Sequence, residues 1–106
     1  MRAFVIEHRG DEVVTEVRDV DADAFLEGDV DVDVTWSSLN FKDAMVARPK
    51  SRVARRDVLI GGVDAVGTAS ADVGEHRAGD AVIAHGHGFG TSHHGGFAPR
   101  LRCDGA

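Results

Sequence analysis

The stretch Asp29–Val34 reads DVDVDV, an alternation of aspartate and valine without a break. Successive side chains of a β-strand point to opposite faces. The pattern therefore predicts a strand with three valines and Trp36 on one face and three aspartates on the other. Same-face residues along a strand stand too far apart to share an ion without other ligands, so we favour a solvated face over a hard-cation site.

The rest of the chain also predicts short strands separated by glycine turns. Gly10-Asp11 between the first two predicts a hairpin. One short helix is predicted at Asn40–Ala47, stopped at Arg48-Pro49 because proline disfavours helical geometry in the residue before it. The other predicted strands are Arg2–Glu7, Glu12–Val17, Val63–Ala71, Ala81–His85 and Phe97–Arg102. This pattern is typical of a mainly β fold, a partly open barrel with one short helix.

Length and composition narrow the class of protein. A chain of 106 residues predicts one domain with a modest core. The formal net charge of -6 argues against nucleic acid as a partner. No apolar run approaches the ~18 residues of a membrane span, and the first residues lack the apolar core of a signal peptide. Cys103 is the single cysteine, which excludes an internal disulfide. We therefore expect a cytoplasmic protein without a membrane partner.

The segment Trp36–Met45 is the main candidate for a functional site. It places Asn40 and Asp43 three residues apart where a strand gives way to a helix, so the two side chains share one face. They fit a helix start, with Asn40 as N-cap and Asp43 reaching back to it. They also fit an amide and a carboxylate that address one ligand together. The two interpretations are compatible and both stay open.

Ser37–Ala44 reads SSLNFKDA, Val63–Thr68 reads VDAVGT, and residues 85–98 read HGHGFGTSHHGGFA. These segments resemble those of the zinc-independent quinone reductases and acrylyl-CoA (acryloyl-CoA) reductases of the medium-chain dehydrogenase/reductase superfamily. Ser37–Ala44 matches the signature SSLNYKDA, with Phe41 in place of tyrosine. Val63–Thr68 is similar to the G-I-D-x-A-G-T segment, and Ala78–Asp80 to the P-G-D turn. Residues 85–98 resemble the loop TGWGVG…HWGGYA. The blocks follow the family's order, from Met1 to about Arg102.

The resemblance implies a GroES-like fold and an NADPH-dependent oxidoreductase. Its small-molecule substrate would be an enoyl-CoA (acrylyl-CoA-like), reduced at its C=C bond, or a quinone. The residues implied are Asn40 and Asp43 as catalytic, Phe41 with Asn40 as cofactor-binding, and Ser38, Lys42, Gly88 and His93 in the substrate cleft. Phe41 keeps an apolar wall but lacks the relatives' tyrosine hydroxyl, so the difference bears on activity.

The cofactor itself needs a further domain. The chain has no G-x-G-x-x-G between a strand and a helix, so the Rossmann domain is absent from it. By the resemblance, residues 1–106 are an N-terminal GroES-like domain, incomplete by itself, whose nucleotide-binding partner lies downstream or on another chain. The sequence leaves open whether two copies of the chain form a homodimer. The alternative is a non-catalytic truncated relative or a small interaction module.

Metal is not expected at the site. Asn40 stands where zinc-dependent members carry a cysteine, and Gly62-Val63-Asp64 stands where they carry a histidine segment, so we expect no zinc. His85, His87, His93 and His94 could bind Zn, Ni or Cu adventitiously. A polar loop is favoured, because a flexible loop must be ordered before it coordinates a metal. Compared with the relatives, His87 and His94 replace tryptophans.

A basic run interrupts the acidic chain after the predicted helix. Its members are Arg48, Lys50, Arg52, Arg55 and Arg56. Guanidinium groups pair well with phosphate oxygens, so this run could meet a phosphate of CoA or NADPH. A solvated loop is the more frequent explanation of such a run.

Overall fold

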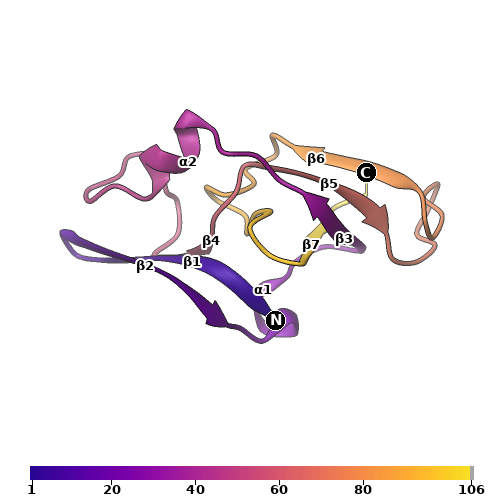
Figure 1. Cartoon of the computed structure of the whole chain (residues 1–106), viewed down its shortest axis with the longest axis horizontal. Helices are drawn as coiled ribbons and strands as arrows, with labels where there is room; N and C mark the ends of the chain where they lie inside the picture. Colours follow the sequence, from indigo (N-terminus) through magenta and orange to yellow (C-terminus); the bar gives the residue numbers. More distant parts are fainter. Residues whose placement is uncertain (106) are drawn as a thin grey trace.

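In the computed structural model, which describes residues 1–105, the chain forms seven short strands and two short helices (Figure 1). In chain order they are β1 (Arg2–Arg9), β2 (Glu12–Asp19), α1 (Ala22–Phe25), β3 (Val30–Trp36), α2 (Phe41–Val46), β4 (Val58–Ile60), β5 (Asp64–Ala69), β6 (Ala81–His85) and β7 (Arg100–Cys103). The described strands form two antiparallel sheets, ordered β2-β1-β4 and β6-β5-β3-β7. The predicted mainly β, partly open fold is confirmed. The helical turn α1 was not predicted.

The three-stranded sheet is built on the predicted hairpin. Gly10 takes a positive φ of 62° at the turn between β1 and β2, a conformation that glycine adopts without steric cost. β4 pairs with the other edge of β1, where Ile6 lies opposite Leu59 and both are buried. β4 was not predicted, because three residues are too few to display an alternating pattern.

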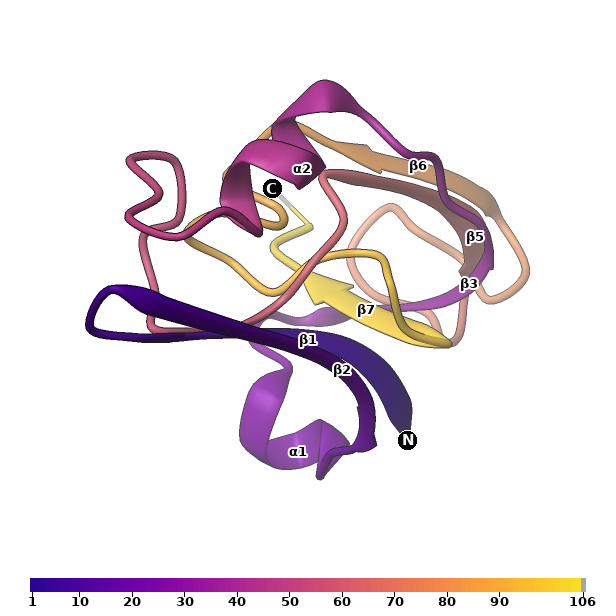
Figure 2. The ribbon, with the colours of Figure 1, turned by 60° about the vertical axis from the view of Figure 1, so that its left-hand side comes forward.

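Irregular backbone around Gly61 and around Phe97 joins the two sheets. The Phe97 N–H donates to the Gly61 carbonyl at 2.9 Å, and the Phe4 N–H donates to the Phe97 carbonyl at 2.9 Å. Phe97 thus pairs with the three-stranded sheet, and β7 begins only at Arg100, later than the predicted strand Phe97–Arg102. Figures 1 and 2 show the β1–β2 hairpin on one side of the molecule, β5 and β6 on the other, and α2 beyond the end of β3.

The alternating strand is confirmed in β3, but its last residue faces the other way. Val30 and Val32 are buried, as predicted. The pairing of β3 with β5 shifts register between Val34 and Trp36, which places Trp36 opposite the outward-facing Val66. Trp36 is 72% exposed, so the prediction that it shares the valine face was wrong. A β-bulge adds one residue to a strand and turns the following side chains over.

The core lies in three clusters rather than one. The first packs the inner face of the four-stranded sheet, where Val30 and Val32 meet Phe89 and Leu101. A second holds the start of β1 against β4. The third joins Ile6, Leu59 and Val46, and so fixes α2 on the three-stranded sheet. Among the described residues, no helix is long and apolar enough to cross a membrane.

Candidate functional site

The first turn of α2 is capped from within the candidate segment. The Asn40 N–H donates to Asp43 Oδ2 at 2.8 Å, and the Asp43 N–H donates to the Asn40 carbonyl at 3.0 Å. Asn40 is extended, with φ -122° and ψ 159°, and the helix follows it directly. The helix predicted at Asn40–Ala47 is therefore confirmed, and so is the interpretation of this pair as a helix start.

Asp43 also ties the helix to a distant part of the chain. Its side chain is largely buried, and its Oδ1 accepts a hydrogen bond from the Val63 N–H at 3.0 Å. Both carboxylate oxygens thus accept backbone N–H groups, one from Asn40 and one from the segment before β5. Asp43 therefore positions α2 against the four-stranded sheet.

The Asn40 side chain is exposed and held by three oxygens. Its Nδ2 lies 3.1 Å from Ser38 Oγ, 3.2 Å from Asp64 Oδ2 and 3.4 Å from Asp43 Oδ2. Carboxylates only accept hydrogen bonds, so the amide nitrogen must face them and the amide orientation follows. The amide oxygen is the end of this group that accepts hydrogen bonds, and it lies at the capping-box position of α2.

Asp64 is the member of this network that sequence analysis missed. It begins β5, 24 residues after Asn40, and accepts from Ser38 Oγ at 2.7 and 2.9 Å as well as from Asn40. The only signal was its place in the segment Val63–Thr68, where it was noted without a role. The side chains of Ser38, Asn40, Asp43 and Asp64 form what we call the amide network.

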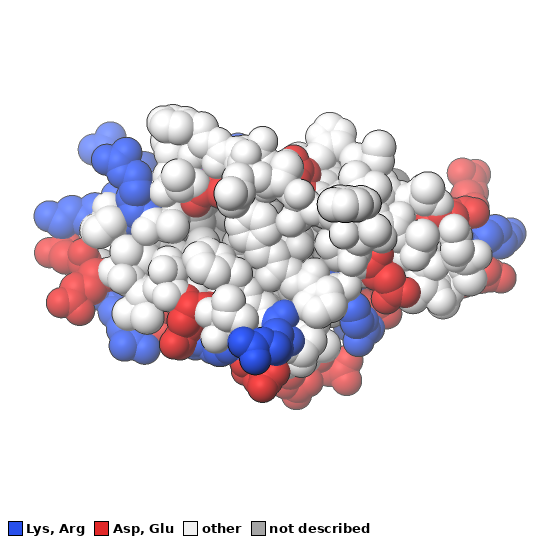
Figure 3. All heavy atoms as spheres, viewed as in Figure 1, with Lys and Arg blue, Asp and Glu red and all other residues white. Residues whose placement is uncertain are grey.

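Apolar side chains surround the amide network. Leu39 and Phe41 are 86% and 80% exposed, next to Asn40 in the chain. Register places Trp36, Val66 and Ile83 side by side across β3, β5 and β6, and all three are exposed; we call them the apolar row. The row lies on the same sheet face as Asp64, two residues before Val66 in β5. Figure 3 shows mainly uncharged atoms over α2 and β6.

The other predicted cleft residues lie outside the amide network. Lys42 is exposed on α2, and its side chain makes no hydrogen bond or ion pair with any described residue. Gly88 has a φ of 78°, and its carbonyl accepts from the N–H groups of Thr91, Ser92 and His93 at 3.0 Å each. Gly88 therefore shapes the loop that carries His93.

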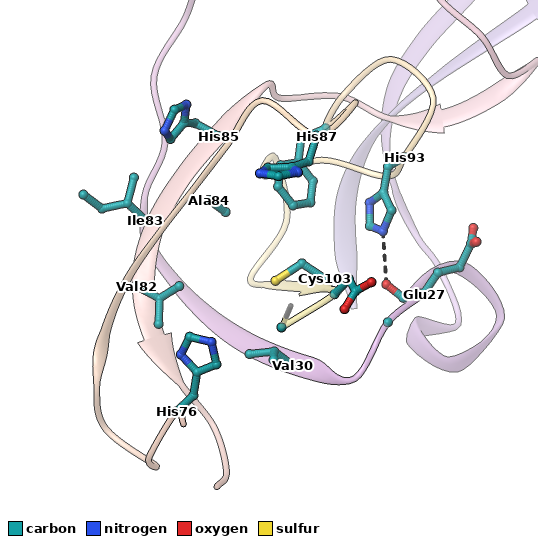
Figure 4. Close-up of a pocket in the computed structure, with 14 residues that line it drawn as sticks. Glu27, Val30, His76, Val82, Ile83, Ala84, His85, His87, His93 and Cys103 are labelled. Carbon is teal, nitrogen blue, oxygen red and sulfur yellow. Dashed lines mark hydrogen bonds between the residues drawn. The ribbon is translucent and has the colours of Figure 1, made fainter. Parts of the chain in front are cut away.

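His93 lines a hollow of about 690 Å³ together with Val30, Val82, Phe89 and Cys103 (Figure 4). Its Nδ1 and Nε2 lie 2.8 Å from the His94 carbonyl and 3.1 Å from the Glu27 carbonyl. None of the residues that line this hollow belongs to the amide network or to the exposed pair Leu39 and Phe41. The structure thus brings Ser38, Asn40 and Asp43 together and leaves His93 in a separate place.

His94 is buried between the sheets. Its Nδ1 accepts from the Ile60 N–H at 3.1 Å, and its ring packs 5.0 Å from that of Phe25. Burial lowers the pKa of His94 to about 4, and the Arg56 guanidinium adds to this effect. The ring is therefore neutral, and Arg56 Nη1 lies 3.2 Å from its Nε2. The described histidines of this loop do not combine with other donors into a group of three that could hold a metal ion.

Known relatives of the chain carry the names of oxidoreductases. No protein-family model matches the chain. A probable acrylyl-CoA reductase of Escherichia coli K12 is 37% identical over 106 residues, which cover 99% of this chain and 33% of that protein. A putative quinone oxidoreductase of Bacillus subtilis is 30% identical over 98 residues, 92% of this chain and 30% of that protein.

Solved structures agree with the sequence comparison. An E. coli YhdH structure with bound NADPH matches 97% of this chain and 32% of its own, with a TM-score of 0.86 and 37% identity. A B. subtilis YhfP structure with bound NAD matches 98% of this chain and 32% of its own, with a TM-score of 0.90 and 28% identity. The chain therefore spans about a third of the length of the relatives that it matches.

Proposed function

The chain belongs to the medium-chain dehydrogenase/reductase superfamily, in the group of acrylyl-CoA reductases and quinone oxidoreductases, and on that premise we propose that it is the catalytic-domain part of an NADPH-dependent reductase. The reaction is reduction of the C=C bond of an enoyl-CoA, or of a quinone. One observation carries the proposal: three oxygens hold the amide nitrogen of Asn40, and the exposed Phe41 is the next residue in the chain.

The site fits one side of a nicotinamide. An exposed phenyl ring offers an apolar wall, and the amide oxygen of Asn40 accepts hydrogen bonds such as those of a carboxamide N–H. The sequence has no phosphate-binding turn, so the rest of the cofactor is held by a nucleotide-binding domain downstream or on another chain. The apolar row and Leu39 lie beside this site and suit contact with such a domain.

The residues of this chain orient the cofactor and the substrate. Bound NADPH supplies a hydride to the acceptor. Ser38 and Asp64 hold the Asn40 amide, Asp43 fixes the backbone that carries it, and Phe41 excludes water from one side of the site. Correct placement of reactants is a large part of catalysis by such enzymes. Phe41 has no hydroxyl, so a proton comes from water or from a group outside this chain.

The test uses the intact protein that carries this chain. We expect NADPH oxidation, followed by absorbance, when an enoyl-CoA or a quinone is added, and mass spectrometry should find the saturated thioester as product in the first case. Absence of oxidation with both acceptors would contradict the proposal and favour a non-catalytic relative.

A further inference from the structure

The positively charged side chains without a partner gather on α2 and the loop after it. Most other arginines are engaged: Arg9, Arg18, Arg100 and Arg102 form ion pairs, as does Arg56 within the loop itself, and Arg77 donates to two backbone carbonyls. Of the cations in residues 1–105 with no hydrogen bond or ion pair to another described residue, Arg2 alone lies elsewhere. The others are Lys42, Arg48, Lys50, Arg52 and Arg55.

This segment, residues 47–57, is an ordered loop, which we call the basic loop. Ser51 Oγ accepts from the N–H groups of Val53 and Ala54 at 3.2 and 3.1 Å. Both residues pack against the third core cluster. The Arg55 N–H donates to the Thr91 carbonyl at 2.9 Å. The fold thus anchors the apolar residues of the loop and turns its cations outward.

The basic loop encloses a small hollow of positive charge. Arg48, Lys50 and Arg52 line a hollow of about 250 Å³ with Met45 of α2. No carboxylate occurs in the sequence between Asp43 and Asp57, so Asp57 at the end of the basic loop is its single acidic residue. Figure 3 shows Lys and Arg atoms at the end of the molecule where Figure 1 places this loop. In a chain with a formal net charge of -6, this is a local concentration of positive charge.

Helix α2 connects the basic loop to the amide network. Phe41 and Met45 lie four residues apart on α2, about 6 Å of helix rise. The amide network and the hollow thus lie at opposite ends of one short helix, an arrangement that suits a molecule with a reactive end and distant phosphate groups. A CoA thioester has this form, whereas a quinone has no phosphate to place there.

We propose that the basic loop binds the phosphate groups of a CoA thioester whose acyl end lies at the amide network. The inference rests on the proposed function and narrows its substrate to the thioester. Guanidinium groups form strong charge-assisted hydrogen bonds with phosphate oxygens, and exposed cations lose little hydration in doing so. The phosphates of NADPH are the competing source of the same chemistry, and the experiment separates the two.

The test compares two substrates in the intact protein. The double variant Arg48→Gln/Arg52→Gln should raise KM for an enoyl-CoA about tenfold, a loss expected for charge-assisted contacts. It should leave KM unchanged for the same enoyl group on N-acetylcysteamine, which has no phosphate. The KM for NADPH should stay constant. Arg2→Gln is the matched control, since Arg2 is also exposed and unpaired but lies outside the basic loop.

Direct binding gives a readout independent of turnover. Calorimetry with adenosine 3′,5′-bisphosphate should show a similar tenfold loss of affinity in the double variant and none in Arg2→Gln. Equal effects on both thioesters, no effect on either, or an effect confined to NADPH would each overturn the inference. If no acceptor is reduced but bisphosphate binding still depends on the basic loop, the proposed function fails and the phosphate site stands.

Discussion

Asn40 and Asp43 are neighbours in the amide network but make different kinds of contact. Asp43 is 8% exposed and accepts two backbone N–H groups, so its loss leaves two donors without their partner. The Asn40 side chain is exposed, and its amide nitrogen contacts three side-chain oxygens. The structure therefore distinguishes Asp43, whose main contacts maintain the fold, from Asn40, which is free to touch a ligand.

The first prediction follows from this difference. Asn40→Ala should lower kcat/KM of the intact enzyme by tenfold or more, which is ~1.4 kcal/mol of transition-state stabilisation, with little change in Tm. Asp43→Ala should lower kcat/KM as well, but with a loss of about 1–3 kcal/mol in the free energy of unfolding. Steady-state kinetics and thermal melts of both variants test this. Full activity of Asn40→Ala would mean that Asn40 and Asp43 act only as a helix cap.

Phe41→Tyr tests the departure from the related signature. Tyrosine restores the relatives' hydroxyl, and because the ring is exposed the added polar atom costs little stability. We expect activity to stay the same or rise. A large loss of kcat without a change in Tm would mean that the site is adapted to phenylalanine.

His94 gives a prediction on pH. Its pKa is about 4 in the folded chain against an ordinary 6.5, because burial disfavours the charged ring. The unfolded chain therefore binds the proton more readily. Its contribution to stability is complete above pH 6.5, falls as the pH is lowered, and levels off below about 4, a change of up to about 3 kcal/mol. His94→Asn keeps an acceptor for the Ile60 N–H but does not titrate, so denaturant melts between pH 4 and 7 should show a weaker pH dependence in this variant.

At the scale of elements, β3 and β5 form the frame of the site. β3 leads into Ser38 and Asn40, and β5 begins with Asp64, so their pairing brings the amide network together. The backbones approach closely at Gly67, where a Cβ would overlap the Asp33 carbonyl oxygen. The glycine is needed there for space, since a main-chain atom cannot move aside as a flexible side chain can.

Gly67→Ala should therefore cost more stability than Gly61→Ala. A Cβ at Gly61 would meet the side chains of Ile6 and Phe97 at 3.0 and 3.2 Å, and side chains can adjust. We expect a loss of about 1–3 kcal/mol for Gly67→Ala, as for other overpacked sites, and a smaller loss for Gly61→Ala. Urea unfolding of both variants measures the difference. Equal losses would show that β3 and β5 separate at little cost.

At the scale of the whole molecule, the chain presents two polar sites and one uncharged surface. The amide network and the basic loop lie at the two ends of α2, and the apolar row continues from the network across three strands. A reductase of the proposed kind places its cofactor between this surface and a second domain. On the proposed function, we expect that second domain to supply most of the contacts to the cofactor.

The isolated 106-residue chain should bind NADPH weakly. Its sequence has no glycine-rich turn at a helix start to hold the pyrophosphate, so only one wall of the nicotinamide site is present. Calorimetry should detect no binding in the micromolar range, and the intact protein serves as the positive control. Micromolar affinity of the isolated chain would mean that it holds the phosphates by other residues.

What the sequence alone determined about this protein is local. The hairpin at Gly10, the buried valines of β3 and the helix after Asn40 follow from contacts a few residues apart, where turn chemistry, alternation and capping operate. The resemblance of short segments also indicated the candidate site, which stays a prediction. Only the tertiary structure decided that Asp64 orients Asn40, that a bulge turns Trp36 outward, and that His94 is neutral. Each of these depends on a partner 24 or more residues away, and the pairing of strands brings that partner into contact.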